Sequence, residues 1–261
     1  MNHTPRIREK WSKGQLCVGT SASLADAAIS ELYGEAGYDF VWIDMEHSAM
    51  TIADASAHVH AARASGTAAW IRVPSDDPVV VKPILELHPA GIIVPRIDSA
   101  ERAEAAVRSC RYPPRGVRGF GPSRGVRYGL TCPSDYLAQV DEQMMVILQI
   151  EHIDAIKDID NIVSVPGIDS ITVGPGDLSL SMNLPGQSGH PDVNSAIETI
   201  FQAGMKKHIP VGHSTGYDPA AVQKWIDQGI SWISCDGDWQ FMMKSAKNML
   251  DEIRAMSSKC A

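Results

Sequence analysis

The chain alternates between short apolar runs and longer segments in which apolar residues recur at helical spacing. Runs that are apolar on both faces, such as VWIDM and GIIVP, are typical of strands buried within a parallel sheet. Eight runs are predicted as strands: Leu16–Thr20, Phe40–Met45, Ala68–Val73, Gly91–Ile97, Met145–Ile150, Ser170–Val173, Ile209–His213 and Trp232–Cys235. The segments predicted as helices are Ser23–Ala36, Ala53–Ser65, Ser99–Cys110, Asp154–Val163, Pro191–Lys207, Asp218–Gln228 and Trp239–Met256.

This alternation indicates an α/β fold of repeated strand–helix units. Eight units within 261 residues, with no Pro/Gly/Ser-rich linker between them, predict one (β/α)8 TIM barrel spanning residues 1–261. A doubly wound open sheet is the alternative. It usually has fewer strands, and no G-x-G-x-x-G sequence follows the first run.

Composition and charge narrow the classes of protein. Hydrophobic residues make up 44% and charged residues 21%, as in ordinary globular proteins. The formal net charge of −8 argues against nucleic-acid binding. No apolar run approaches the ~20 residues of a membrane helix, and the polar segment Met1–Gly14 gives no secretion signal. Five widely spaced cysteines fit reduced thiols, so we expect a cytoplasmic protein.

Charged residues follow several predicted strands at the end where barrels hold their active sites. Glu151 and Asp177 follow adjacent strands, so their carboxylates can share one hard divalent cation, with Gln149 orienting one of them. The alternative is a pair of surface acids or helix caps. The Gly174–Gly176 turn would let backbone N–H groups face an anion, although such a sequence is often only a turn.

Two further strand ends carry candidate chemistry. Arg72 emerges from an apolar run and needs an anionic partner, either a substrate carboxylate or a neighbouring acid in a structural salt bridge. His47 follows Asp44, whose carboxylate could hold the imidazole in one tautomer and make it a proton carrier. A hydrogen-bonded structural histidine is the alternative.

Two loops bear on the substrate. The segment Arg111–Gly129 is rich in Gly, Pro and Arg, which favours a functional loop or a contact surface, including a subunit contact. The loops after the last two predicted strands have no phosphate-binding glycine-rich sequence, and Asp236 and Asp238, after the eighth strand, would repel a phosphate. We therefore expect a small-molecule substrate without a phosphate group.

Several motifs taken together resemble one known family over about Gly14–Leu250. They are WIDMEHS (Trp42–Ser48), IRVP (Ile71–Pro74), GIIVPRIDSAERAEAAV (Gly91–Val107), RYPPRGVRGFGP (Arg111–Pro122), QIE (Gln149–Glu151), GPGDLS (Gly174–Ser179) and PGQSGHPDV (Pro185–Val193). In order and spacing they resemble the HpcH/HpaI aldolases, which are class II, metal-dependent pyruvate aldolases. Two positions depart from the family pattern: Glu86–Ala90 has bulk where small residues are usual, and Asp236 stands where glycine is frequent.

The resemblance implies a barrel in a trimer or hexamer, with the last helix exchanged between subunits. It implies reversible cleavage of a 4-hydroxy-2-oxoacid to pyruvate and an aldehyde through a metal-stabilised pyruvate enolate. By the resemblance, Glu151 and Asp177 bind the metal (Mg²⁺, Mn²⁺ or Co²⁺), and Gln149 and Glu46 lie near it. Arg72 contacts the pyruvyl oxygen, and the Gly176 and Asp177 amides bind the pyruvate carboxylate. His47, paired with Asp44, carries out the acid–base chemistry.

Chemistry leaves two alternatives beside the aldolase. The same enolate serves oxaloacetate decarboxylation, and a non-catalytic barrel could bind a 2-oxoacid. A Schiff-base aldolase is disfavoured, because no lysine occupies a central strand end.

Overall fold

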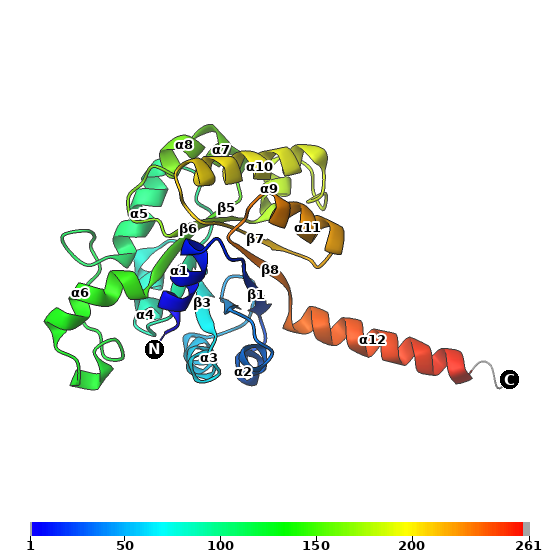
Figure 1. Cartoon of the computed structure of the whole chain (residues 1–261), viewed down its shortest axis with the longest axis horizontal. Helices are drawn as coiled ribbons and strands as arrows, with labels where there is room; N and C mark the ends of the chain where they lie inside the picture. Colours follow the sequence, from blue (N-terminus) through cyan, green and yellow to red (C-terminus); the bar gives the residue numbers. More distant parts are fainter. Residues whose placement is uncertain (1, 258–261) are drawn as a thin grey trace.

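The eight predicted strands form a closed parallel barrel in chain order (Figure 1). The structure is a computed structural model and describes residues 2–257. Strand β1 pairs with both β2 and β8, which closes the barrel and excludes the open-sheet alternative. The strands are β1 (Cys17–Ala22), β2 (Phe40–Asp44), β3 (Ala68–Arg72), β4 (Gly91–Val94), β5 (Met145–Ile150), β6 (Ser170–Val173), β7 (Val211–Thr215) and β8 (Trp232–Gly237).

Helices surround the barrel and link successive strands (Figure 1). They are α1 (Thr4–Ser12), α2 (Ala28–Glu35), α3 (Ile52–Ala64), α4 (Pro78–Leu85), α5 (Ala100–Cys110), α6 (Pro133–Gln143), α7 (Ile153–Lys157), α8 (Ile159–Ile162), α9 (Pro175–Ser181), α10 (Pro191–Lys206), α11 (Pro219–Asp227) and α12 (Asp238–Ser257). The predicted (β/α)8 barrel is thus confirmed.

Aromatic side chains fill the barrel interior toward the N-terminal ends of the strands. The rings of Phe40 and Trp70 stack with centroids 3.9 Å apart, and Trp232 lies edge-on to Trp70 at 5.1 Å. Gly212 makes room for this cluster, since a Cβ there would lie 1.8 Å from the Trp232 ring. A packed interior closes this end of the barrel and leaves the C-terminal strand ends for a site.

The sequence missed four helices and misplaced the start of another. Helices α4, α6 and α9 begin at prolines, and α4 also contains Pro83, so their prolines suggest loops instead. The polar helix α1 has no apolar periodicity that stands out. Helix α2 begins at Ala28 instead of Ser23, because the carboxylate of Asp238 binds the backbone N–H groups of Ser23 and Leu24.

Helix α12 extends away from the barrel (Figure 1). Among its residues only Asp238 is buried. The large apolar side chains exposed along it are Trp239, Met242, Met243, Met249, Leu250, Ile253 and Met256. A single chain therefore leaves an apolar helix face uncovered. Within residues 2–257, no helix combines the length and apolar character needed to cross a membrane.

Candidate active site

Two adjacent pockets lie at the C-terminal ends of the strands. The first, of about 350 Å³, is lined by the predicted residues Asp44, His47, Arg72, Gln149, Gly176 and Asp177. The second, of about 300 Å³, is lined by Glu151, Glu46 and Arg96, and it shares His47 and Asp177 with the first. The structure therefore brings every predicted site residue to one rim of the barrel.

Arg72 lies between two carboxylates. The register places Asp44 on β2 opposite Arg72 on β3. Arg72 Nε donates to Asp44 Oδ1 at 3.0 Å and Nη2 donates to Oδ2 at 2.6 Å, while Nη1 lies 3.2 Å from Glu46 Oε2. The side chain of Arg72 is 11% exposed and still lines the first pocket. Arg72 therefore has acid partners within the chain, and its guanidinium still lies at the pocket wall.

The Asp44 carboxylate holds the turn after β2 as well. Its Oδ1 accepts hydrogen bonds from the backbone N–H groups of Glu46 at 3.0 Å and His47 at 3.2 Å. Burial alone would raise the pKa of Asp44, but the bonds from Arg72 and from these amides lower it overall. Asp44 is therefore ionised, and it holds both the Arg72 side chain and the backbone of the turn.

The His47 ring has a different neighbour from the one predicted. Its Nε2 lies 3.7 Å from Glu46 Oε2, and the side chain is 56% exposed. Asp44 contacts the backbone of His47 and turns its carboxylate toward Arg72. The expected pairing of the ring with Asp44 was wrong, because the in-register arginine takes both carboxylate oxygens.

Glu151 is buried and held in one orientation. Its Oε1 accepts a hydrogen bond from the backbone N–H of Arg96 at 2.7 Å, and its Oε2 accepts one from the side-chain amide of Gln149. Gly174 provides the space, since a Cβ there would lie 2.2 Å from Glu151 Oε2. The predicted orienting role of Gln149 agrees with this contact.

Negative charge at Glu151 is poorly compensated. Burial is the main reason that the pKa of Glu151 rises to about 7. The hydrogen bond from Gln149 lowers this pKa, whereas the nearby charges of Glu46 and Asp177 raise it. The pKa of Glu46 is also raised, mainly by burial and then, against the effect of Arg72, by the charges of Asp44 and Asp177. Buried oxygens Glu46 Oε2 and Gln149 Oε1 accept no hydrogen bond from any described residue.

This donor set fits a hard cation that also takes ligands from outside the protein. Carboxylate oxygens are preferred by Mg²⁺ and related ions, which keep positions for water or substrate. Over the described part of the chain, no group of three or more His, Cys, Asp or Glu residues is arranged to hold a metal ion. Glu151 and Asp177 line the same pocket and could together contribute carboxylate oxygens to such a cation.

The sequence missed part of the first pocket. Its other walls include Ser21 on β1, Ser23 just after β1, Ser214 on β7, and Trp239 and Gln240 at the start of α12. Serines recur at the C-terminal ends of two strands, and this pattern could have predicted these pocket residues. Attention to charged residues alone missed it. The pocket is therefore lined on this side by hydroxyl, amide and indole groups.

Asp236 and Asp238 do not line either pocket. Asp236 Oδ1 accepts a hydrogen bond from the backbone N–H of Tyr217 at 3.1 Å, and Asp238 binds the backbone of Ser23 and Leu24. Asp236 has a φ of 51°, a region that favours glycine, consistent with the frequent glycine noted above. The argument that these carboxylates repel a phosphate therefore has no support in the geometry.

Comparisons with known proteins identify the family. A family model described as HpcH/HpaI aldolase/citrate lyase matches residues 19–238. The chain belongs to this family. A 2-dehydro-3,6-dideoxy-6-sulfogluconate aldolase of Pseudomonas putida is 34% identical over 89% of this chain and 91% of its own length. A 5-keto-4-deoxy-D-glucarate aldolase of Klebsiella pneumoniae is 30% identical over 92% of this chain and 93% of its own.

A solved structure agrees with the sequence comparison. The crystal structure of an HpcH/HpaI aldolase from Desulfitobacterium hafniense superposes with a TM-score of 0.89 at 29% identity, covering 95% of this chain and 96% of that one. Named aldolases match nearly the whole chain at about 30% identity. The HpcH/HpaI chain is thus an enzyme, a lyase of the aldolase type that acts on small molecules.

Proposed function

We propose that this aldolase cleaves a 4-hydroxy-2-oxoacid reversibly to pyruvate and an aldehyde, with a divalent cation held by Glu151 and Asp177. The observation that carries the proposal is the buried Glu151 carboxylate, which lines one pocket together with the carboxylates of Glu46 and Asp177. A cation at this point would relieve the repulsion among the carboxylates. Mg²⁺, Mn²⁺ and Co²⁺ all suit such oxygen ligands.

The bound cation would supply Lewis-acid polarisation of the C2 carbonyl of the oxoacid. Arg72 adds a fixed positive charge from the wall of the same pocket, where negative charge develops on the C2 oxygen. Asp44 holds the guanidinium in place with two hydrogen bonds, so little reorganisation is needed. The backbone N–H groups of Gly176 and Asp177 are assigned to the pyruvate carboxylate.

Proton transfer at the aldehyde oxygen is assigned to His47. Its ring is exposed to both pockets and is near one carboxylate, Glu46, at 3.7 Å. A solvent-accessible imidazole can take a proton from the 4-hydroxyl in cleavage and return it in the reverse direction. The contact with Glu46 would limit the orientation of the ring.

The substrate class follows from the pocket walls and from the relatives. The two named relatives act on oxoacids with further hydroxyl or acid groups. Here Ser21, Ser23 and Ser214 line the first pocket and offer hydroxyl groups there. We propose a hydroxylated aldehyde as the second product, and a panel of aldehydes ranked by kcat/KM tests this.

A direct test of the proposed site is exchange of the pyruvate methyl protons with D₂O, followed by NMR. Exchange should require a divalent cation, stop with EDTA and fall to background in Glu151→Gln. Asp154→Asn is the matched control, because Asp154 is exposed and pairs with Lys157 outside the pockets. Exchange that persists in Glu151→Gln, or in EDTA, would rule out this metal site.

We further propose that the enzyme is a cytoplasmic trimer or hexamer in which α12 packs on another subunit. The exposed apolar face of α12 supports the assembly, since a soluble monomer rarely leaves such a face uncovered. The described cysteines Cys17, Cys110, Cys132 and Cys235 are free thiols, as expected in a reducing compartment. Cys260 lies outside the described residues.

A further inference from the structure

A basic pocket of about 530 Å³ lies at the N-terminal end of the barrel, opposite the active site. Its walls include Arg63 at the end of α3, His88 just before β4, and Arg124 and Arg127 from the loop before α6. Gln143, which ends α6 ahead of β5, adds an amide. None of the described residues that line this pocket is an aspartate or glutamate.

Arg124 and Arg127 add positive charge to this pocket, and no described residue that lines it is a carboxylate. Burial and then the charge of Arg124 lower the pKa of Arg63, and burial lowers the pKa of Arg124 itself. Arg124 Nη1 contacts Nε2 of His60, an imidazole rather than a carboxylate. Neither Arg124 nor Arg127 belongs to an ion pair found within residues 2–257. The half-buried guanidinium of Arg124 favours an anionic partner in this setting, and the exposed Arg127 adds a second positive charge beside it.

His88 lines the same pocket and is affected by the charges of the arginines around it. It is buried, and its pKa falls to about 4 through burial first and then through the charges of Arg63, Arg118 and Arg124. The imidazole is therefore neutral near pH 7. A neutral ring offers one N–H donor to a bound oxyanion without adding a further positive charge to the wall.

The loop that carries the arginines adopts a costly backbone conformation at this point. Arg127 and Tyr128 have φ values of 50° and 56°, which side-chain-bearing residues adopt rarely. Backbone hydrogen bonds from Tyr128 to Ser123 at 2.8 Å and from Thr131 to Val126 at 3.0 Å fix the turn. Strain of this kind gathers at binding sites, where the surrounding structure maintains it.

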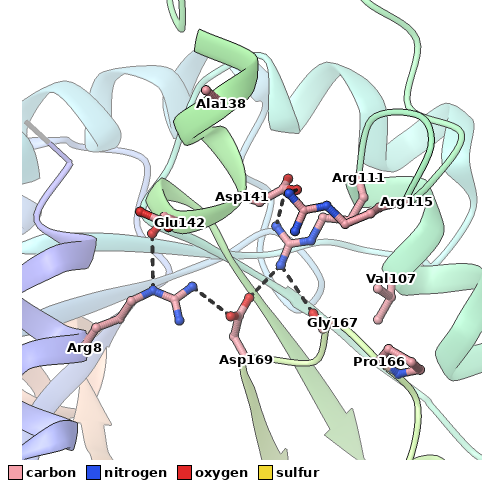
Figure 2. A pocket seen from close by; sticks show the side chains of 10 residues that line it. All are labelled: Arg8, Val107, Arg111, Arg115, Ala138, Asp141, Glu142, Pro166, Gly167 and Asp169. Carbon is pink, nitrogen blue, oxygen red and sulfur yellow. Dashed lines mark hydrogen bonds and ion pairs between the residues drawn. The ribbon is translucent and has the colours of Figure 1, made fainter. Parts of the chain in front are cut away.

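A second arginine-lined pocket provides the contrast (Figure 2). It also lies toward the N-terminal end of the barrel and has a volume of about 700 Å³. Here Asp169 lies 2.7 Å from both Arg8 and Arg111, and Asp141 lies 2.7 Å from Arg115 (Figure 2). Its arginines are already paired with carboxylates, so this pocket has no unbalanced charge to attract an anion.

We propose that the basic pocket binds a small, multiply charged oxyanion, either a phosphate group or a polycarboxylate. The guanidinium groups of Arg124 and Arg127, from the loop before α6, would contact it, and the volume suits a small metabolite. The site is remote from the proposed metal, and its occupancy stabilises the folded chain by linkage. Its ligand is distinct from the 2-oxoacid substrate.

The experiment measures binding of inorganic phosphate and, separately, citrate by calorimetry and by thermal unfolding. The protein is the full chain in EDTA, and sodium chloride keeps the ionic strength constant. At least one of the two anions should raise Tm in a saturable way. Arg124→Gln and Arg127→Gln should each weaken its binding about tenfold, the loss expected for one charged hydrogen-bonding group.

Two control variants separate this pocket from other anion sites. Arg115→Gln removes an arginine of the carboxylate-paired pocket, and Arg72→Gln removes the arginine of the active site. Both should bind the anion as the parent chain does. Absence of saturable binding by either anion, equal binding in Arg124→Gln and Arg127→Gln, or loss of binding in Arg72→Gln would each overturn the proposal.

Discussion

Asp44 holds Arg72 through two parallel hydrogen bonds between in-register positions on β2 and β3, with distances of 3.0 and 2.6 Å. The same carboxylate accepts the backbone N–H groups of Glu46 and His47. One buried acid therefore fixes both the guanidinium and the turn that carries the proposed proton carrier.

Asp44→Asn should separate these two functions. The amide oxygen can still accept the backbone bonds, but the ion pair with Arg72 is lost. We expect kcat/KM for aldol cleavage to fall about tenfold to hundredfold, as for loss of a charged hydrogen bond, with little change in Tm. Asp39→Asn, which breaks the more exposed pair with Lys10 at the other end of β2, is the control and should retain activity. Equal activity of the two variants would contradict an orienting role.

The sequence predicted all eight strands because buried parallel strands are short, continuous apolar runs. Glu151 and Asp177 were placed at the same rim because strand ends of a barrel converge there. The partner of His47 was missed, because spacing along the chain does not show that Arg72 is in register with Asp44. Helices α4, α6 and α9 begin at prolines and were missed, since the same residue can start a helix or break one. Helices α10 and α11 also begin at prolines and were predicted.

Gly174→Ala tests whether Glu151 needs its present orientation. A Cβ at position 174 would lie 2.2 Å from Glu151 Oε2, so the carboxylate must move. The backbone at Gly174 is extended, so alanine itself is not strained there. We expect Mn²⁺ affinity, measured by calorimetry, to fall about tenfold to hundredfold.

Gly176→Ala is the matched control for that change. It lies two residues away, keeps its backbone N–H, and has no atom within 4 Å of an added Cβ. Its Mn²⁺ affinity should equal that of the parent chain. The same loss in both variants would show that the effect is general to this turn.

His213 should make the fold sensitive to acid. It is buried against Phe201 and Trp225, and burial, followed by the charge of Lys224, lowers its pKa to about 4. The unfolded chain takes up a proton near the ordinary value of 6.5, so stability is full above that pH and is lost as pH falls toward 4. The loss attributable to this residue is on the order of 3 kcal/mol.

His213→Leu removes this titration while keeping an apolar side chain of similar size. In urea unfolding at pH 7 and pH 4.5, the variant should lose less stability between the two pH values than the parent chain. His88, whose pKa is also lowered to about 4, supplies part of the acid sensitivity that remains. An unchanged pH dependence would show that His213 does not titrate between the two states.

The apolar face of α12 should determine the oligomeric state. Met249 and Ile253 are exposed one turn apart, at 61% and 56%. If another subunit covers them, each contributes about 1.5–3 kcal/mol to assembly. The double variant Met249→Lys/Ile253→Lys should therefore sediment as a smaller species with an unchanged far-UV spectrum. Asn248→Lys places the same charge on the opposite face of the helix and should leave the assembly intact. Dissociation in both, or in neither, would remove this face from the interface.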